Sequence, residues 1–344
     1  GRVPTALHQR VHPAIPGVND SMPGSASGRL QFGFSVFPYS RFRDVEELAQ
    51  VVSLGDELGF DAAALPEHLL PPAWPGADLS AKLWYDLPAL ITFLAARTSR
   101  IAFLTSVLVV PYHHPVRLAK ALATVDVLSG GRLWLGVGTG WMAAEFRRLG
   151  IPYEARGAIT DEYLRAMIHL WSSERPSFHG NHVSFDDVSF FPKPVQRPHM
   201  PIMVGGTGPR PFSRVVEIGQ GWYPMSGGPE EIQRGVKRLR ELLTAAGRDP
   251  SSLWVGCGGV SMGEDPQTAR MRHDAGAVEA GGLCRTPGEA IDRIHRYRAA
   301  GATFISLGVN WANADELGSR LKLLASDVLP AFRDSSGDSL TLWH

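Results

Sequence analysis

A glutamate followed by a histidine is the part of this sequence best suited to acid–base chemistry. Glu67 and His68 stand after Pro66, at the end of a predicted buried strand over residues 61–68. Because imidazole titrates near neutral pH, a histidine in such a place can give or take a proton in a binding site. We expect His68 to be a catalytic acid or base, with Glu67 orienting the histidine or a bound ring. The alternative is a histidine that only holds a loop carbonyl.

Two glycine-rich segments indicate where an anion could bind. Gly136, Gly138 and Gly140 form a GxGxG pattern, and Gly205-Gly206-Thr207 ends the next predicted strand. This pattern lacks the GxGxxG spacing and the later acidic residue of a dinucleotide-binding fold, so it excludes a Rossmann site. Glycines can either permit a tight turn or let backbone N–H groups approach a phosphate. The second loop on a neighbouring strand favours a phosphate site.

The cysteines and the other histidines form no metal motif. Cys257 and Cys284 are the only cysteines, and neither belongs to a CxxC or cysteine–histidine pattern that would bind zinc. His113 and His114 precede Pro115 at the start of a predicted helix, where capping or surface roles are expected. We therefore expect no metal in this protein.

Composition and charge restrict the kinds of partner. The 344 residues include 34 basic and 34 acidic side chains, so no net charge attracts nucleic acid or an anionic membrane. No apolar run reaches the roughly 18 residues of a membrane-spanning helix. With 44% hydrophobic residues, the chain can bury a large core. We expect a soluble cytoplasmic protein that binds a small molecule, with no nucleic acid and no membrane as partner.

The spacing of apolar residues predicts eight strand–helix repeats that would position these groups. Short β-branched or aromatic runs alternate with segments of helical periodicity. The predicted strands cover residues 31–38, 61–68, 101–110, 132–137, 201–204, 221–223, 253–260 and 303–309, and the predicted helices cover residues 44–59, 86–98, 115–128, 160–171, 209–218, 229–246, 287–300 and 314–332. Eight such units, with no linker between two cores, predict an α/β fold that is a single (β/α)8 TIM barrel. In that barrel the strand ends that carry the residues above share one mouth.

A long segment interrupts the repeats after the fourth βα unit. Residues 172–199 are polar, aromatic and proline-rich, and they exceed an ordinary loop. We expect an insertion there, with a hairpin over residues 178–185. The chain is thus divided into a flexible N-terminal tail, residues 1–29, the barrel, residues 30–333, and a C-terminal tail, residues 334–344.

Several longer strings of residues together resemble one protein family. They are Gly59-Phe60-Asp61 leading to Pro66-Glu67-His68, Thr105-Ser106-Val107-Leu108, the string from Gly131-Arg132-Leu133 through residues 136–141 to Glu145-Phe146, and Phe191-Pro192-Lys193-Pro194-Val195-Gln196 followed by Pro201-Ile202 and Gly205-Gly206. From about residue 31 to residue 330 the chain resembles the bacterial luciferase-like monooxygenase superfamily, and specifically its coenzyme F420-dependent oxidoreductase branch. The combination is far more specific than any one loop.

The resemblance implies where a flavin-type ring and its phosphate-bearing tail bind. Glu67 and His68 would flank the ring, and Ser106 and Val107, joined by a cis peptide in a bulge after the third strand, would back it. The tail would meet two loops, Gly138-Thr139-Gly140 with Trp141, and Gly205-Gly206-Thr207. The family's sugar-phosphate dehydrogenases carry a carboxylate where this chain has Trp141, so the resemblance favours an apolar or aromatic substrate.

The resemblance leaves two cofactors open, and the cofactor decides the reaction. Ser106-Val107, Gly138-Thr139-Gly140 and an arginine-rich composition typical of actinobacteria favour F420 over FMN; only five of the 34 basic residues are lysines. We expect hydride transfer between F420 and a small organic substrate. One alternative is an FMN-dependent monooxygenase served by a separate reductase. Another is a non-catalytic flavin or deazaflavin carrier, whose sign would be an insertion that plugs the barrel mouth. The family often dimerises through barrel helices, so a homodimer is expected.

Overall fold

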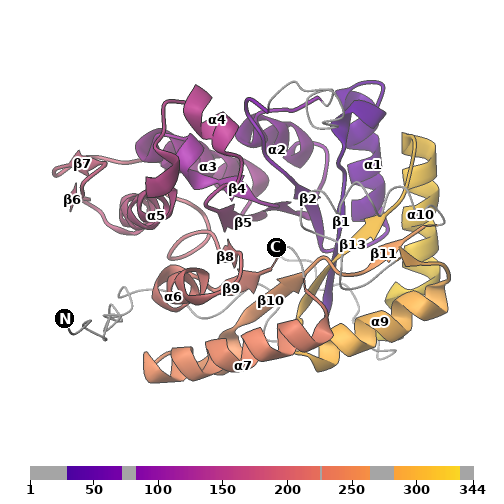
Figure 1. The fold of residues 1–344 in the computed structure, drawn as a ribbon. Coiled ribbons are helices and arrows are strands. Elements are labelled where there is room, and N and C mark those ends of the chain that lie inside the picture. Colours follow the sequence, from indigo (N-terminus) through magenta and orange to yellow (C-terminus); the bar gives the residue numbers. More distant parts are fainter. Residues whose placement is uncertain (1–28, 72–82, 225–226, 264–282, 334–344) are drawn as a thin grey trace.

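Eight parallel strands form a closed barrel surrounded by helices (Figure 1). The computed structural model describes residues 29–71, 83–224, 227–263 and 283–333. In chain order the barrel strands are β1 (Gln31–Ser35), β2 (Ala62–Leu65), β3 (Ala102–Thr105), β5 (Leu133–Gly138), β8 (Ile202–Gly205), β9 (Gly221–Tyr223), β10 (Trp254–Cys257) and β13 (Phe304–Val309). β1 pairs with β13, with Gln31 opposite Phe304, and this pairing closes the barrel. The predicted (β/α)8 fold is confirmed.

All the main helices except α5 begin where the sequence supplies a cap or a proline. They are α1 (Val45–Glu57), α2 (Leu87–Ala95), α3 (Pro115–Ser129), α5 (Arg156–Ser172), α6 (Pro209–Ile218), α7 (Pro229–Ala245), α9 (Pro287–Ala299) and α10 (Ala314–Asp327). Asp44, Asp86 and Asn313 each accept a hydrogen bond from a backbone N–H of the first turn that follows. The short helix α4 (Ala143–Arg148) was not predicted, because six residues are too few to show helical periodicity.

Large side chains fill the interior of the barrel. Trp134, Tyr223, Trp254 and Phe304 pack there, and the rings of Trp134 and Trp254 meet edge to face with centroids 4.8 Å apart. Ala62 is part of the same cluster and leaves room for these rings. Because the interior is a packed core, a ligand must bind at an end of the barrel.

A bulge lies between β3 and the short strand β4 (Leu108–Val109). Leu104 of β3 is opposite Trp134, and Leu108 of β4 is opposite Val137. Four steps along one strand therefore match three steps along its neighbour, which is one extra residue. The peptide bond between Ser106 and Val107, inside the bulge, is cis, so the expectation from the resemblance is confirmed.

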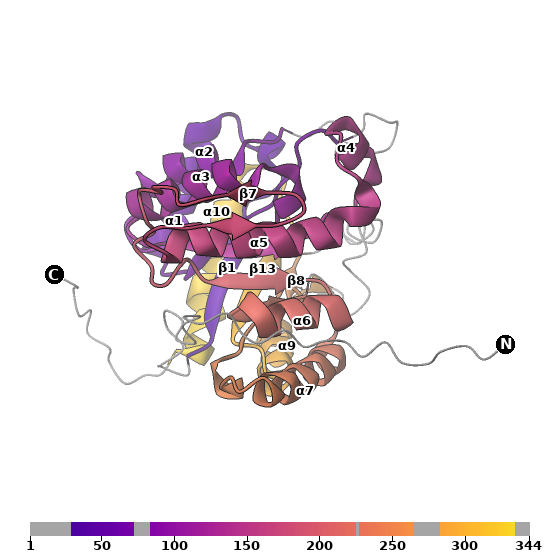
Figure 2. The same ribbon diagram turned by 90° about the vertical axis from the view of Figure 1, so that its left-hand side faces the viewer.

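The insertion packs on the outside of the barrel. β6 (Phe178–His179) and β7 (Ser184–Phe185) form the predicted hairpin, which lies against α5 (Figure 2). Glu162 of α5 accepts hydrogen bonds from the backbone N–H groups of residues 181–183. Further along the chain, the N–H groups of Val195 and Gln196 donate to the buried carboxylate of Asp126 in α3. The insertion is thus bound to helices on the outside, and it does not plug the mouth.

Two short strands extend the sheet beyond the predicted ones. β11 (Ser261–Met262) pairs with β13 and with β12 (Leu283–Cys284), and two residues are too few for a period-2 pattern. Both predicted tails fall almost wholly outside the described residues, which begin at Arg29 and end at Arg333. Within the described ranges, no helix has the length and apolar character needed to cross a membrane.

We predict that Gly136→Ala destabilises the fold. A Cβ at this position would lie 2.1 Å from the carbonyl oxygen of Thr105, a backbone atom that cannot move without shifting the bulge. Overpacking of this kind costs about 1–3 kcal/mol, so the midpoint of urea denaturation should fall. The matched control is Gly157→Ala in α5, where a Cβ would approach only the Arg210 guanidinium, at 3.7 Å, and where alanine favours the helix. Equal midpoints for the two variants would contradict this role of Gly136.

Candidate active site

The carboxyl ends of the strands form an accessible mouth that contains the sequence-predicted residues. β5, β8 and β13 are buried along their lengths and become partly exposed at their last residues. Half-buried positions there are Ser106, Val107, Gly138, Thr139, Gly140 and Gly205, and exposed positions are Trp141, Gly206 and Thr207. His68, at the end of β2, is also half-buried. The fold therefore brings the predicted residues to one end of the barrel.

His68 is held by a carboxylate that the sequence analysis did not select. Its Nδ1 lies 2.6 Å from Oε2 of Glu145, which stands on α4 directly after the glycine loop of β5. Glu145 is completely buried. It also accepts hydrogen bonds from the backbone N–H groups of Leu69 and Leu70 and from the Tyr112 hydroxyl. The residue that orients His68 is thus Glu145 and not the neighbouring Glu67. Glu145 does belong to one of the sequence strings that carry the family resemblance, and this membership could have identified it as a candidate site residue.

Glu67 is turned into the wall of the barrel. Its side chain is buried, with Oε2 accepting the backbone N–H of Val109 at 2.7 Å and Oε1 lying 2.8 Å from Nε2 of His113. His114 is exposed, as expected, but His113 pairs with Glu67 instead of capping α3 or lying free on the surface. Two histidine–carboxylate pairs therefore hold the mouth, and each joins residues far apart in the sequence.

The surroundings of these pairs set their protonation states. Burial opposes ionisation of Glu145, but the hydrogen bond and charge of His68 and the bonds from Leu70 and Tyr112 outweigh it and hold the pKa of Glu145 below its usual value. Burial, together with the nearby carboxylate of Glu145, raises the pKa of the Tyr112 hydroxyl. At neutral pH, Glu145 is therefore an ionised acceptor and Tyr112 a protonated donor.

Aromatic rings surround His68. The ring centroids of Trp84 and Trp141 lie 4.7 Å and 6.1 Å from that of His68, both edge to face. Trp84 is also stacked on Phe37, with centroids 4.6 Å apart. Trp141 is 57% exposed, so part of this side chain is available to a ligand. This wall suits a planar or apolar group beside the histidine.

The glycines after β5 have a packing role next to the bulge. A Cβ on Gly138 would lie 2.7 Å from Cγ2 of Val107, and Gly140 has a φ of 77° and is crowded by Val109 and Phe146. Ser106, on the other side of the cis peptide, has its Oγ 3.2 Å from the hydroxyl of Tyr223. The absence of side chains at these positions lets the backbone of β5 approach the bulge closely.

The second glycine loop leads into α6, and an arginine lies beside the first loop. Gly206 and Gly208 have φ values of 93° and 98°, which explains why glycine is needed there. Pro209 and Pro211 in the first turn of α6 have no N–H, so this helix offers an anion two backbone donors fewer than a helix without proline. Arg156, which begins α5, donates from Nε to the carbonyl of Gly140 at 3.2 Å. The guanidinium of this arginine, which the sequence analysis missed, could pair with a phosphate at the loops.

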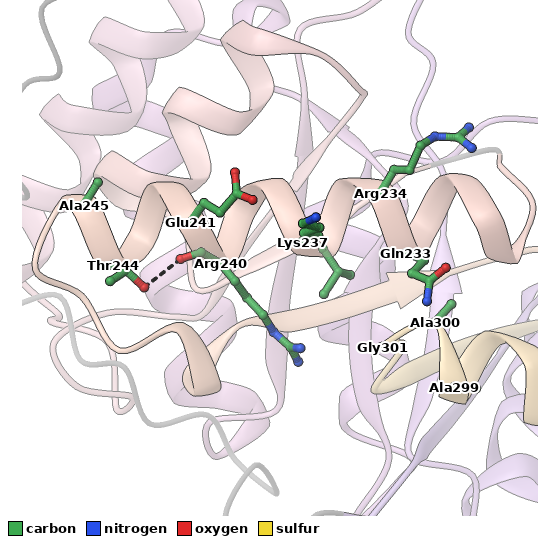
Figure 3. Close-up of a pocket in the computed structure, with 11 residues that line it drawn as sticks. Gln233, Arg234, Lys237, Arg240, Glu241, Thr244, Ala245, Ala299, Ala300 and Gly301 are labelled. Atoms are coloured by element: carbon green, nitrogen blue, oxygen red, sulfur yellow. Dashed lines mark hydrogen bonds between the residues drawn. The ribbon is translucent and has the colours of Figure 1, made fainter.

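Other features of the described residues that could suggest a site do not support one. A groove of about 1060 Å³ lies on the outside of the barrel between α7 and the end of α9, lined by Arg234, Lys237 and Arg240 among others (Figure 3). It contains none of the mouth residues. Residues 259–263 match GxSxG, yet Ser261 lies within the strand β11 and not on the strand-to-helix turn of a serine nucleophile. Within the described ranges, no three His, Cys, Asp or Glu side chains are placed to hold a metal.

Comparison with known proteins finds matches in the family that the sequence motifs resemble. A family model described as luciferase-like monooxygenase matches residues 11–303. An F420-dependent glucose-6-phosphate dehydrogenase of Microbacterium testaceum is 32% identical over 226 residues, which are 64% of this chain and 64% of that protein. An FMNH2-dependent dimethylsulfone monooxygenase of Pseudomonas putida is 28% identical over 225 residues, 64% of this chain and 60% of that protein.

Two further matches extend the comparison. An uncharacterized protein of Mycobacterium tuberculosis is 40% identical over 167 residues, 48% of this chain and 57% of its own length. The match thus spans less than two thirds of each of these three relatives. The crystal structure of a monooxygenase from Streptomyces bottropensis superposes with a TM-score of 0.72 and 26% identity, covering 88% of this chain and all of that one.

We predict that the pair of His113 and Glu67 stabilises the fold more at low pH than at high pH. Burial lowers the pKa of His113, but the hydrogen bond and charge of Glu67 outweigh it, so the pKa is raised above its usual 6.5. A raised folded-state pKa contributes stability below about 6.5 that is lost as the pH rises through the raised value. The difference in unfolding free energy between the wild type and His113→Gln should therefore be larger at pH 6 than at pH 9. A difference that grows with pH would contradict the assignment.

Proposed function

The chain belongs to the luciferase-like monooxygenase family, and on that premise we propose that it is an oxidoreductase that transfers a hydride between coenzyme F420 and a small organic substrate at the mouth of the barrel. The observation that carries the proposal is the position of His68. Oε2 of the buried, ionised Glu145 lies 2.6 Å from Nδ1 of its ring. The ring lies beside an aromatic wall, after the strand β2 that pairs with β3 ahead of the bulge at Ser106 and Val107. This is an acid–base group placed beside a surface fit for a ring.

The residues of the mouth fit a tricyclic ring with an anionic tail. Val107 presents a half-buried apolar surface, and the neighbouring Gly138 has no Cβ, which would otherwise come within 2.7 Å of Val107. In the proposal, Ser106 and Val107 support the ring. The tail lies along Gly138-Thr139-Gly140 with Trp141 and along Gly205-Gly206-Thr207, and Arg156, beside Gly140, supplies positive charge.

F420 supplies hydride chemistry when bound and reacts poorly with oxygen, whereas reduced FMN would support oxygen insertion. In our proposal His68 exchanges a proton with the substrate atom that gains or loses charge as the hydride moves, which is an effect of roughly 10²–10⁴ in rate. Glu67 has an indirect role in the proposal, because its hydrogen bonds to Val109 and His113 hold in place the segment that faces the site. Trp141 has no carboxylate to offer, so we propose an apolar or aromatic substrate that stacks on its exposed ring.

An FMN-dependent monooxygenase served by a separate reductase is the second candidate. It is favoured by the 28% identity to the FMNH2-dependent monooxygenase of Pseudomonas putida and by the 26% identity to the Streptomyces bottropensis monooxygenase over 88% of this chain. Nothing favours the third interpretation, a non-catalytic carrier, since the insertion lies outside the barrel. We further propose a homodimer, from the family resemblance, and a cytoplasmic location, from the low number of cysteines.

We predict that F420 binds at least tenfold more tightly than FMN, a gap of about 1.4 kcal/mol. The physical reason is that the longer anionic tail of F420 can reach both glycine loops and the arginine beside them. Separate titrations of the purified protein with each cofactor, followed by fluorescence, measure the two dissociation constants. Equal or reversed affinities would overturn the F420 assignment in favour of FMN.

A matched pair of variants at exposed Thr207 controls for where the tail lies. Thr207→Glu and Thr207→Gln are nearly equal in size and differ by one negative charge. If the tail lies at this loop, the glutamate variant should bind F420 several-fold more weakly than the glutamine variant, and added salt should reduce the difference. The same affinity in both variants would remove Thr207 from the proposed site.

We predict that His68→Ala lowers kcat by about 10² or more while F420 affinity stays within a few-fold. The reason is that His68 exchanges a proton in the transition state and contributes little to holding the ring. Turnover is followed through the absorbance of F420 with a panel of small apolar and aromatic alcohols and ketones. Loss of cofactor binding with turnover intact at saturation would make His68 a binding group, and no change in either quantity would leave it a structural residue.

A further inference from the structure

The four partners of the Glu145 carboxylate divide evenly between its two oxygens. Oε1 accepts the backbone N–H groups of Leu69 at 2.9 Å and Leu70 at 2.8 Å. Oε2 accepts the Tyr112 hydroxyl at 2.9 Å and faces Nδ1 of His68 at 2.6 Å. The group is completely buried, so every one of these bonds is made without competition from bulk water.

This division determines which nitrogen of His68 carries the proton. An ionised carboxylate can only accept hydrogen bonds, and these donors outweigh the effect of burial, so Glu145 is ionised at neutral pH. An acceptor at 2.6 Å from Nδ1 requires a hydrogen on that nitrogen. A neutral imidazole has a single N–H, so Nε2 is then an unprotonated acceptor.

We propose that Glu145 is a positioning residue that fixes neutral His68 as the Nδ1–H tautomer, so that Nε2 takes up a proton from the substrate. The inference rests on the proposed function. In the oxidising direction the O–H bond of an alcohol breaks and the proton bonds to Nε2 of His68. The electron pair of the broken O–H bond forms the C=O bond as the hydride leaves carbon for F420. In the reducing direction the imidazolium, facing the Glu145 carboxylate, returns that proton to the carbonyl oxygen. The substrate class that fits is an apolar alcohol and its ketone or aldehyde.

The alternative tautomer can be produced by one substitution. In Glu145→Gln the two backbone N–H groups of Leu69 and Leu70 can only donate, so the single amide oxygen must take the place of Oε1. The amide NH2 then replaces Oε2 and donates toward Nδ1 and toward the oxygen of Tyr112. An N–H facing Nδ1 requires that nitrogen to be an acceptor, and neutral His68 becomes the Nε2–H tautomer.

The test is nitrogen-15 NMR of the histidine rings in the cofactor-free protein, at a pH where His68 is neutral. The ring signals of His68 are identified by their loss in His68→Gln. We expect a protonated Nδ1 and an unprotonated Nε2 in the wild type, and the reverse in Glu145→Gln. With F420 and an alcohol substrate present, the Glu145→Gln variant should lose kcat in the oxidising direction by about 10² with KM little changed, because Nε2 can no longer accept a proton.

Glu162→Gln is the matched control. Glu162 is also a buried carboxylate that accepts several backbone N–H groups, those of residues 181–183, and among the described residues it makes no hydrogen bond to a histidine ring. It carries the same substitution and the same kind of structural cost, and it should leave the His68 signals unchanged.

Two results would overturn the proposal: a wild-type His68 protonated on Nε2, or a Glu145→Gln variant that keeps the wild-type tautomer. The wild-type spectrum is decisive even if Glu145→Gln does not fold. Because the spectra are recorded without cofactor, they separate this proposal from the assignment of F420. A failed F420 titration would leave the tautomer in place, and a wrong tautomer would leave the cofactor assignment untouched.

Discussion

The buried carboxylate of Glu145 joins three segments that meet only in the folded barrel. It bonds to the segment after β2 through His68, Leu69 and Leu70, to the segment after β4 through Tyr112, and it stands itself on α4 after β5. A buried charge is costly unless its hydrogen bonds are satisfied, and here four donors satisfy it. The mouth therefore keeps one arrangement, since moving any of the three segments would leave this charge short of a donor.

The bulge after β3 and the glycines of β5 depend on each other in a similar way. The extra residue at Ser106 and Val107 pushes the strand toward its neighbour, and only residues without a Cβ can stand opposite. Gly136 faces the carbonyl of Thr105 and Gly138 faces Val107. In the sequence this pattern left a tight turn and phosphate binding both open, and the structure gives it a packing reason, which is the close approach of two backbones. If the proposed cofactor tail binds at these glycines, a substitution there would affect the fold and the site together.

The sequence predicted the barrel well because its elements follow simple patterns. Buried β-branched runs and capped amphipathic segments define the eight strands and helices, and the hairpin of the insertion has its own turn residues. The elements that escaped, α4, β11 and β12, are too short for any periodicity. Glu145 escaped for another reason: it lies 77 residues from His68, and no local pattern predicts which distant carboxylate meets a given ring. The positions of the site residues could be predicted, but not the bonds between them.

The attachment of the insertion to Asp126 and Glu162 separates two properties of the molecule. Asp126 is buried near the end of α3 and receives the backbone of Val195 and Gln196 there, while the aromatic residues around His68 occupy the strand ends at the mouth. Changes to one region do not remove a hydrogen bond from the other. The length and sequence of the insertion, and with them the outer surface presented to other macromolecules, could thus change in evolution while the chemistry at the mouth stayed the same. Equally, the residues at the mouth could change to accept new substrates without loss of the outer scaffold.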